Sequence, residues 1–148
     1  MEDLAAEALT VALLAASRAV VDGISAGVRA RGFTDVRPAH GFAFARLARG
    51  DATITQLADH LDITRQAAAQ LADELVAKGY IERRDHPDDG RAKLLVLTSK
   101  GWACTRAAEA AIAETVASWE SVLGAGKLRV LRADLEQLAA RGPLRPLW

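Results

Sequence analysis

The feature that most constrains the fold is residues 54–98, where two short helical segments are followed at once by two β-prone runs. We expect Thr55 and Thr64 to cap the two helices, because a threonine hydroxyl accepts a hydrogen bond from a free backbone N–H of the first turn. The turn between them contains Asp62, where a left-handed conformation is commonly needed and aspartate tolerates it. Gly79 suits the C′ position that ends the second helix. The segment predicts a helix-turn-helix, with a ligand-free αα-hairpin as the alternative.

Two β-prone runs follow, "YIERRD" and "AKLLVLT", and the loop "HPDDGR" joins them into a hairpin. A helix-turn-helix followed directly by such a hairpin is typical of a winged helix. The loop is acidic at its centre and basic on both shoulders. Two interpretations compete: an ordinary solvated turn, and a finger that contacts a negatively charged partner.

The second helix of the pair, from about residue 64 to residue 78, has two distinct faces. At 100° per residue one face collects the side chains that we expect to pack: Ala68, Leu71, Ala72 and Leu75. The opposite face, near the helix start, holds Arg65, Gln66, Ala69 and Gln70. Arginine and glutamine can hydrogen-bond to base edges, and a small alanine permits close approach. Asp73 lies on the same face, where its carboxylate would repel phosphate.

Long amphipathic segments flank this region. Apolar residues recur at helical spacing over about residues 3–31, and Gly27 and Gly32 are expected to end that helix. A short helix is expected to begin at about Pro38, because proline suits the first helical turn. Residues 99–123 and the leucine-rich segment after "GAGK" predict two further helices. Both ends of the chain therefore need apolar partners.

Composition describes an ordinary globular chain of 148 residues, 51% hydrophobic and 26% charged, which is long enough to bury a core. Its net charge of zero conceals a basic belt over residues 29–49, with five arginines and one aspartate. The apolar patch "ALTVALLAAS" follows the acidic "MED", unlike a signal peptide, and is shorter than the roughly 20 residues of a spanning helix. We therefore expect a cytoplasmic protein with no membrane segment.

The sequence contains no nucleophile elbow and no phosphate-binding glycine loop, so we expect no enzymatic activity. His40, His60, His86 and Cys104 do not form a ligand-like spacing, so neither a metal nor a cofactor is expected. The single cysteine, Cys104, excludes a disulfide within one chain. Its place on an amphipathic helix favours a small buried residue over a redox sensor.

The span from about Arg37 to Gly101 resembles the MarR-type winged-helix transcription regulators. The strongest stretch is "DELVAKGYIERRDHPDDGRAKLLVLTSKG", which contains the wing pattern D-x-R at Asp89-Gly90-Arg91 and the pattern LT-x-x-G from Leu97 to Gly101. Upstream, "ITQLADHLDITRQAAAQLADEL" fits the helix-turn-helix of the family. The flanking helices fit in order and length, so the resemblance covers almost the whole chain.

The resemblance implies a mainly α fold with a small β-hairpin wing, in one domain spanning residues 1–148. The winged helix-turn-helix lobe would occupy about 37–100, and dimerisation helices would occupy about 1–31 and 101–148. The family's function is to bind double-stranded DNA as a homodimer at a pseudo-palindromic operator, usually as a repressor released by a small ligand. A dimer also makes physical sense, because one short recognition helix contacts too few base pairs to be selective, whereas two contact half-sites about one helical turn apart.

The resemblance also assigns roles to individual residues. Arg91 would enter the minor groove at the wing tip, Asp89 would hold either that guanidinium or the turn in shape, and Gly90 would allow a sharp bend. On the wing's shoulders, Arg84 and Lys93 would contact phosphates, whereas Arg83 should project from the opposite face of its strand. The recognition helix would present four base-contacting or positioning residues: Thr64, Arg65, Gln66 and Gln70.

An effector pocket in the family lies between the dimer helices and the DNA-binding lobe. His40, Phe44 and Trp102 occur where such a cavity could be lined, and Arg37 beside His40 suggests an anionic aromatic ligand. The alternative is that Phe44 and Trp102 belong to the core. Three functions stay open at this point: a DNA-binding regulator, a winged-helix module that docks on an acidic protein surface, and a thiol- or metal-responsive regulator.

Overall fold

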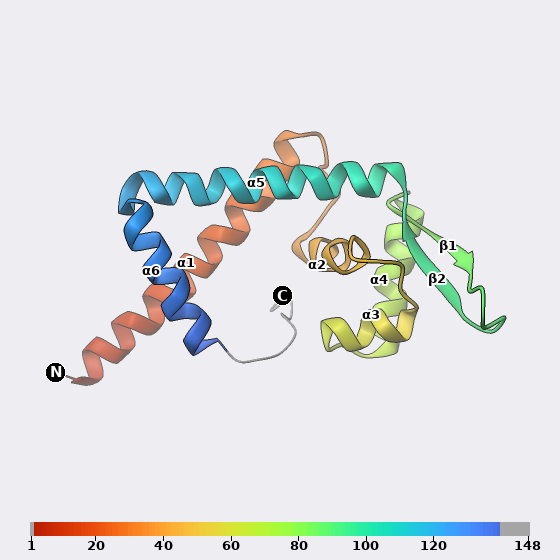
Figure 1. Cartoon of the computed structure of the whole chain (residues 1–148), viewed down its shortest axis with the longest axis horizontal. Helices are drawn as coiled ribbons and strands as arrows, with labels where there is room; N and C mark the ends of the chain where they lie inside the picture. The colour runs from red at the N-terminus through yellow and green to blue at the C-terminus, as the bar shows by residue number, and fades with distance from the viewer. Residues whose placement is uncertain (1, 140–148) are drawn as a thin grey trace.

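The computed structural model describes residues 2–139 and consists of six helices and one β-hairpin within that range. Figure 1 shows the elements in chain order: α1 (Glu2–Ala30), α2 (Pro38–Leu47), α3 (Ile54–Leu61), α4 (Arg65–Ala77), β1 (Ile81–Asp85), β2 (Lys93–Leu97), α5 (Ser99–Leu123) and α6 (Ala125–Leu138). The predicted fold class, mainly α with a small hairpin, is confirmed. Met1 and the part of the expected C-terminal dimerisation segment after residue 139 lie outside the described residues.

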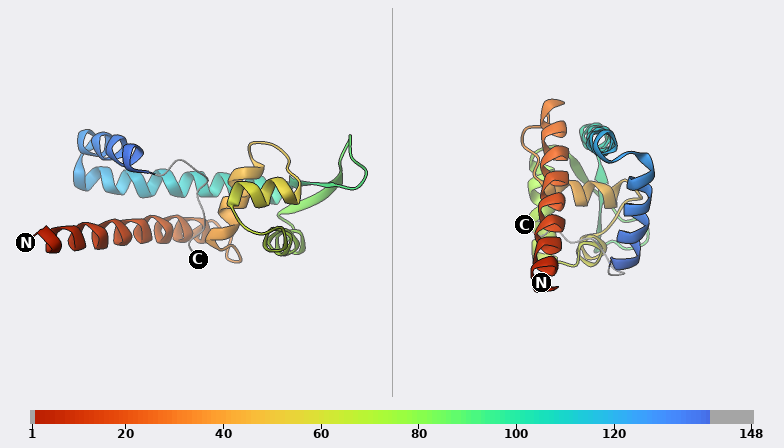
Figure 2. Two further views of the ribbon diagram at one scale, coloured as in Figure 1. Left: turned by 90° about the horizontal axis from the view of Figure 1, so that it is seen from below. Right: turned by 90° about the vertical axis from the view of Figure 1, so that its left-hand side faces the viewer.

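The molecule has a compact lobe at one end and a stem at the other. The lobe contains α2, α3, α4 and the hairpin, and the stem consists of α1 and α5 running side by side (Figure 2). At the far end of α5 the chain turns at Gly124, which has φ +83°, and α6 folds back from it. The start of α1 and the start of α6 therefore lie at the end of the stem away from the lobe (Figure 1).

The two stem helices approach each other closely through small residues. A Cβ added at Gly27 would lie 2.5 Å from the Ala111 Cβ, and one added at Gly23 would lie 2.8 Å from the Thr115 hydroxyl. Gly27 thus lies inside α1, and the expectation that it helps to end the helix is wrong. Gly32, with φ +94°, does follow the end of α1 as expected.

The helix-turn-helix has the expected turn but a different first cap. Thr53, not Thr55, caps α3: its hydroxyl accepts from the Gln56 N–H at 3.2 Å, and the Gln56 side chain accepts from the Thr53 N–H at 2.9 Å. This reciprocal capping box satisfies two free N–H groups, which a lone threonine at 55 would not do. Asp62 is left-handed, with φ 53° and ψ 49°, as predicted. Gly79, with φ +78°, follows α4 as predicted.

The hairpin is antiparallel, with Ile81 opposite Leu97 and Asp85 opposite Lys93. Ala52 adds a short bridge to Leu95, which the sequence did not predict: the Leu95 N–H donates to the Ala52 carbonyl at 2.7 Å. This bridge attaches the segment before α3 to the base of the hairpin. The hairpin is thus joined to the helix-turn-helix on both of its sides.

The lobe has its own core, built around the fully buried Tyr80. Its ring centroid lies 5.4 Å from that of Phe44 and 6.3 Å from that of Phe33. At Gly101 an added Cβ would lie 2.2 Å from the Tyr80 carbonyl oxygen, and the Thr98 hydroxyl donates to that oxygen at 3.1 Å while accepting from the Gly101 N–H. The LT-x-x-G pattern therefore seats the start of α5 directly against the end of α4.

The stem, in contrast, exposes a large apolar surface. Every residue from 4 to 19 is exposed, and apolar side chains are also exposed on α5 and α6. The set is Leu4, Leu9, Val11, Leu13, Leu14, Ile112, Val116, Val122, Leu123, Val130, Leu131, Leu135 and Leu138. Patches of this extent on a single chain mark an interaction surface.

Helix α1 is also more apolar over its length than the sequence analysis expected. The 27 residues Leu4–Ala30 are long and apolar enough to cross a membrane, by length and composition alone. The short patch identified in the sequence understated this stretch, because it contains few charged residues: Glu7, Arg18, Asp22 and Arg29. Arg18 and Asp22 pair with each other at 3.0 Å.

We predict that Gly27→Ala destabilises the protein by about 1–3 kcal/mol, because the added methyl group must displace Ala111 in a packed helix contact. Gly41→Ala is the matched control: Gly41 lies within α2 with nothing within 4 Å of an added Cβ, so the change should stabilise by roughly 0.5–1 kcal/mol. Urea unfolding at fixed protein concentration measures both. Equal stability of the Gly27 variant and the wild type would show that the stem helices are not in close contact.

Candidate nucleic-acid interface

The start of α4 presents the predicted polar side chains to solvent. Arg65, Gln66 and Gln70 are exposed, while Ala68, Leu71 and other members of the opposite face are buried, as the periodicity predicted. Thr64 caps the helix: its hydroxyl accepts from the Ala67 N–H at 3.1 Å. Thr64 therefore sets where the helix begins, and the three polar side chains of its first two turns are free to meet a ligand.

The acidic residue on the same face is neutralised by the wing. Asp73 accepts a hydrogen bond from Arg83 of β1 at 2.6 Å. Arg83 thus leaves its strand toward α4, whereas the neighbouring Arg84 turns to Glu82, with Nε 2.7 Å from the carboxylate. The Asp73–Arg83 pair removes the expected repulsion of phosphate and ties the recognition helix to the base of the hairpin.

At the hairpin loop, Asp89 shapes the backbone. Its carboxylate accepts from the Arg91 backbone N–H at 2.9 Å, which decides between the two roles considered for it in favour of the turn. The Asp88 N–H is bound in a similar way by the His86 ring nitrogen at 3.1 Å. Gly90 does not have a positive φ and has open space around it, so the expectation that the bend needs glycine there is wrong.

The cations of the hairpin differ in whether they have an acidic partner. Lys93 pairs with Asp85 across the two strands, and Arg84 pairs with Glu82. Within residues 2–139, neither Arg91 at the loop nor Arg65 at the start of α4 makes an ion pair. Figure 1 shows the start of α4 and the hairpin loop on the same lower side of the lobe. Two arginines without an acidic partner thus lie where the helix start and the loop face the same way.

Comparison with known proteins fits this arrangement. A family model described as MarR family matches residues 34–92, which include the helix-turn-helix and most of the hairpin. Over these residues the chain is similar to the MarR family. Curated relatives match only locally: the uncharacterized protein Rv2011c of Mycobacterium tuberculosis is 43% identical over 49 residues, or 33% of this chain and 34% of that protein. The chain thus spans about a third of the length of the curated relatives that it matches.

Solved MarR-type structures match over nearly the whole chain. The YusO protein from Bacillus subtilis has a TM-score of 0.73 at 23% identity, covering 94% of this chain and 99% of that one. A variant of MarR from E. coli, crystallised in complex with operator DNA, has a TM-score of 0.73 at 19% identity, covering 89% of this chain and 94% of that one. These likenesses show that the stem helices and the lobe have the arrangement of MarR-type folds.

Two of the five arginines in the basic belt over residues 29–49 have acidic partners within the protein. Arg31 pairs with Glu114 of α5 at 2.5 Å, and Arg37 pairs with Glu74 of α4 at 2.7 Å. Arg46 donates to the Gly50 carbonyl at 2.9 Å. These side chains join elements of the protein to one another, so the local charge count overstated the charge available to a partner.

The three residues expected to line an effector cavity differ in exposure. His40 is 0% exposed with both ring nitrogens bonded, Phe44 is core, and Trp102 is 41% exposed, so the alternative that placed Trp102 in the core is wrong. Two hollows lie elsewhere, one on α1 at Asp22, Ser25 and Arg29 and one on α6 at Lys127, Val130 and Leu131.

Cys104 is 1% exposed, as expected for a small buried residue. Burial raises the pKa of its thiol to about 11, so the reactive thiolate is scarce at neutral pH. Within residues 2–139, no group of three His, Cys, Asp or Glu side chains is close enough to hold a metal ion. The surroundings of Cys104 therefore do not favour a thiol sensor.

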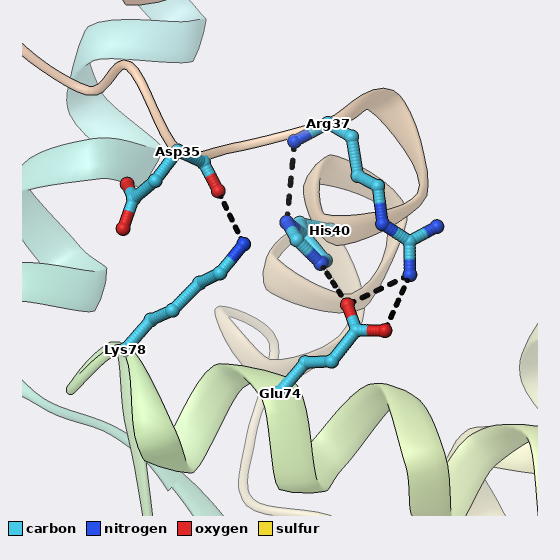
Figure 3. A network of polar contacts seen from close by, with 5 residues as sticks. All are labelled: Asp35, Arg37, His40, Glu74 and Lys78. Atoms are coloured by element: carbon cyan, nitrogen blue, oxygen red, sulfur yellow. Dashed lines mark hydrogen bonds and ion pairs between the residues drawn. The ribbon is translucent and has the colours of Figure 1, made fainter.

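A polar cluster that the sequence analysis missed holds α4 from behind (Figure 3). The Glu74 carboxylate accepts from Arg37 at 2.7 and 3.0 Å and from the His40 Nε2–H at 2.9 Å. The other His40 ring nitrogen accepts from the Arg37 backbone N–H at 3.2 Å, which fixes the ring proton on Nε2. The sequence places Arg37 close to His40 and suggests a bound ligand between them, whereas in the structure both bind Glu74.

The electrostatics of this cluster favour one protonation state. The hydrogen bonds from Arg37 and then His40 lower the pKa of Glu74 from 4.5 to about 2. Burial lowers the pKa of His40, and the hydrogen bond to Glu74 only partly offsets it. At neutral pH the cluster is therefore an ionised carboxylate held by one guanidinium and one neutral imidazole.

We predict that the stabilisation contributed by Glu74 is lost in acid. Because the folded pKa is depressed, its contribution is complete above about pH 4.5 and declines as pH falls toward about 2. The difference in urea midpoint between wild type and Glu74→Gln should therefore shrink from pH 6 to pH 3. Asp73→Asn removes the same charge from the same helix but leaves Glu74 intact, so it should keep the wild-type pH dependence. A difference that stays constant with pH would refute the assignment.

Proposed function

We propose that this chain is a MarR-type, sequence-specific, DNA-binding transcription regulator that acts as a homodimer. The observation that carries the proposal is the distribution of unpaired charge. Arg65 and Arg91 make no ion pair within residues 2–139, while the nearby Arg83, Arg84 and Lys93 each have an acidic partner. These two guanidinium groups have no internal partner and lie on one side of the lobe, at a helix start and at a loop. Such an arrangement suits double-stranded DNA, which a protein can contact in both the major and the minor groove.

In this proposal each element has its own task. Arg65, Gln66 and Gln70 contact base edges in the major groove, and Thr64 positions the helix N-terminus toward the backbone. Arg91 enters the adjacent minor groove, held in place by the turn that Asp89 shapes. Arg84 and Lys93 would have to leave Glu82 and Asp85 before contacting a phosphate. We therefore assign the shoulders a smaller contribution than the loop.

We further propose that a second copy of the chain covers the apolar face of α1, α5 and α6. Exposed apolar side chains occur on all three of these helices, whereas a membrane would cover only α1. The last turns of α1 are also packed on α5 through Gly27 and joined to it by the Arg31–Glu114 pair. A homodimer would cover this apolar face and keep α1 packed on α5, with the lobe at about 37–100 and the flanking segments as the interface. We place the dimer in the cytoplasm, where the DNA is, and assign it no enzymatic role.

Release by a small ligand is the mode of regulation that we propose, with a repressor as its simplest form. Of the three residues expected to bind an anionic aromatic compound, His40 and Phe44 are buried and Trp102 is accessible. Trp102 is therefore the member of that set whose fluorescence should respond first to a phenolic acid.

The function is tested by selecting bound sequences from random duplex DNA with the purified protein, and by measuring its mass in solution. We expect a dimer, an enriched site with two related halves, and binding that weakens steeply with salt. A monomer with no enriched sequence would reject the proposal. Salt-sensitive binding to an acidic protein, without any DNA preference, would instead favour a protein-interaction module.

We predict that Arg91→Ala weakens binding to the selected site at least tenfold, or about 1.4 kcal/mol, with the dimer intact. The reason is that the side chain has no internal partner and its charge is available in full. Arg84→Ala is the matched control on the same hairpin, and it should cost less because Glu82 already holds that guanidinium. Fluorescence anisotropy titrations on one labelled duplex compare the two. Equal effects of the two changes would contradict the distinction between loop and shoulder.

A further inference from the structure

Four polar contacts join the segment 35–40 to α4 and the residues that follow it. Glu74 accepts from Arg37 and from His40, as described above. One helical turn later, the Lys78 ammonium donates to the Asp35 carbonyl oxygen at 2.6 Å. Figure 3 shows both attachments on the same side of α4, with the segment 35–40 lying across them. The Tyr80 hydroxyl adds a third attachment, donating to the Asp35 carboxylate at 2.6 Å.

These contacts fix the orientation of α4, which apolar packing alone does not determine. The packing face of α4 alternates alanine and leucine, at Ala68, Leu71, Ala72 and Leu75. Burial of such a face holds the helix against the lobe, but it is non-directional and permits small rotations and tilts. Hydrogen bonds are directional, and the Glu74 and Lys78 anchors are four residues apart, which is about 6 Å along a helix axis. Two anchors so separated determine both the tilt and the rotation of α4.

The other side of the same segment is fixed to the stem. Residues 31–37 continue directly from α1, with Gly32 in a left-handed conformation at the junction. Arg31 pairs with Glu114 of α5, and the Phe33 ring packs against Tyr80. Few residues therefore separate the stem helices from the anchors on α4. Any change of angle between α4 and the stem must break or strain these contacts.

We propose that the segment 35–40 is an orientation clamp, in which Glu74 and Lys78 are positioning residues that set the angle of α4 relative to the α1–α5 stem. In a dimer joined through the stem, that angle sets the distance between the two recognition helices and selects the half-site spacing. The consequence for DNA rests on the proposed function. The angle between α4 and the stem does not depend on that function, and it can be measured in the protein without DNA.

The chain offers a matched pair of carboxylates for the test. Glu74 and Asp73 are neighbours on α4, and each binds an arginine, but Glu74 is held by the clamp and Asp73 by the wing. Glu74→Gln and Asp73→Asn remove the same charge near DNA, so any purely electrostatic gain in affinity is common to both. Glu74→Met combined with Lys78→Met removes both anchors with no net change in charge.

The first measurement is the distance from stem to recognition helix by pulsed electron paramagnetic resonance, without DNA. Spin labels at Ala77→Cys on α4 and Ala117→Cys on α5 are exposed positions, and the native Cys104 is 1% exposed. Labelled chains are diluted into unlabelled ones so that distances within one chain are recorded. We expect the double variant to at least double the width of the distribution, and Asp73→Asn to leave it unchanged. An unchanged width in the double variant overturns the clamp.

The second measurement is the affinity for a series of duplexes in which the selected site has one or two base pairs inserted or removed between its halves. Wild type and Asp73→Asn should lose at least tenfold in affinity for each one-base-pair change, and the double variant less than threefold. A merely structural role would lower affinity for every spacing alike and would overturn the proposal. If selection finds no preferred DNA, the proposed function fails, and the distance measurement still decides the clamp.

Discussion

The structure depends on the burial of one tyrosine at the point where four elements meet. Tyr80 follows α4 and begins the hairpin, its N–H donates to the Leu75 carbonyl at 2.9 Å, and its carbonyl accepts from Thr98 at the start of α5. Its ring packs on Phe44 of α2, and its hydroxyl reaches Asp35 in the clamp. Burial and the Asp35 hydrogen bond raise the pKa of this phenol, so it stays a donor. The recognition helix, the wing, the clamp and the stem thus share one fixed reference point.

A chain with no net charge can still present positive charge, because internal pairing distributes it unevenly. The arginines that join elements, such as Arg31 and Arg37, are matched by Glu114 and Glu74. Surface ion pairs of this kind contribute little stability singly, but they determine which cations lack a partner. Arg65 and Arg91, unpaired within residues 2–139, lie at the two places where a DNA-binding winged helix must be positive. The lack of an acidic partner at these two arginines, and not the total charge of the chain, is what fits the proposed binding to DNA.

The order of elements was predictable, because helical periodicity, caps and a turn-rich loop act over a few residues. Asp62 and Gly79 could be assigned for that reason, since each meets a local backbone requirement. Contacts between distant residues were not predictable. Nothing near Gly27 in the sequence reveals that Ala111 packs against it, so the sequence alone predicts a helix end there. The sequence alone also predicts a repulsive charge at Asp73, because its partner Arg83 is ten residues away on another element. The clamp was missed in the same way, since Arg37 and Glu74 are 37 residues apart.

The two halves of the molecule must differ in how they become stable. The lobe closes a core of its own around Tyr80 and Leu57, with its polar groups satisfied by caps and ion pairs. In the single chain every residue from 4 to 19 of α1 is exposed, and most of the stability of a helix in a protein comes from the packing of its apolar face. That half of α1 therefore needs an apolar partner to persist as a helix. If the partner is a second copy, assembly orders the stem, and the clamp passes that order on to α4, so a defined angle between two recognition helices is a property of the dimer and of no single chain.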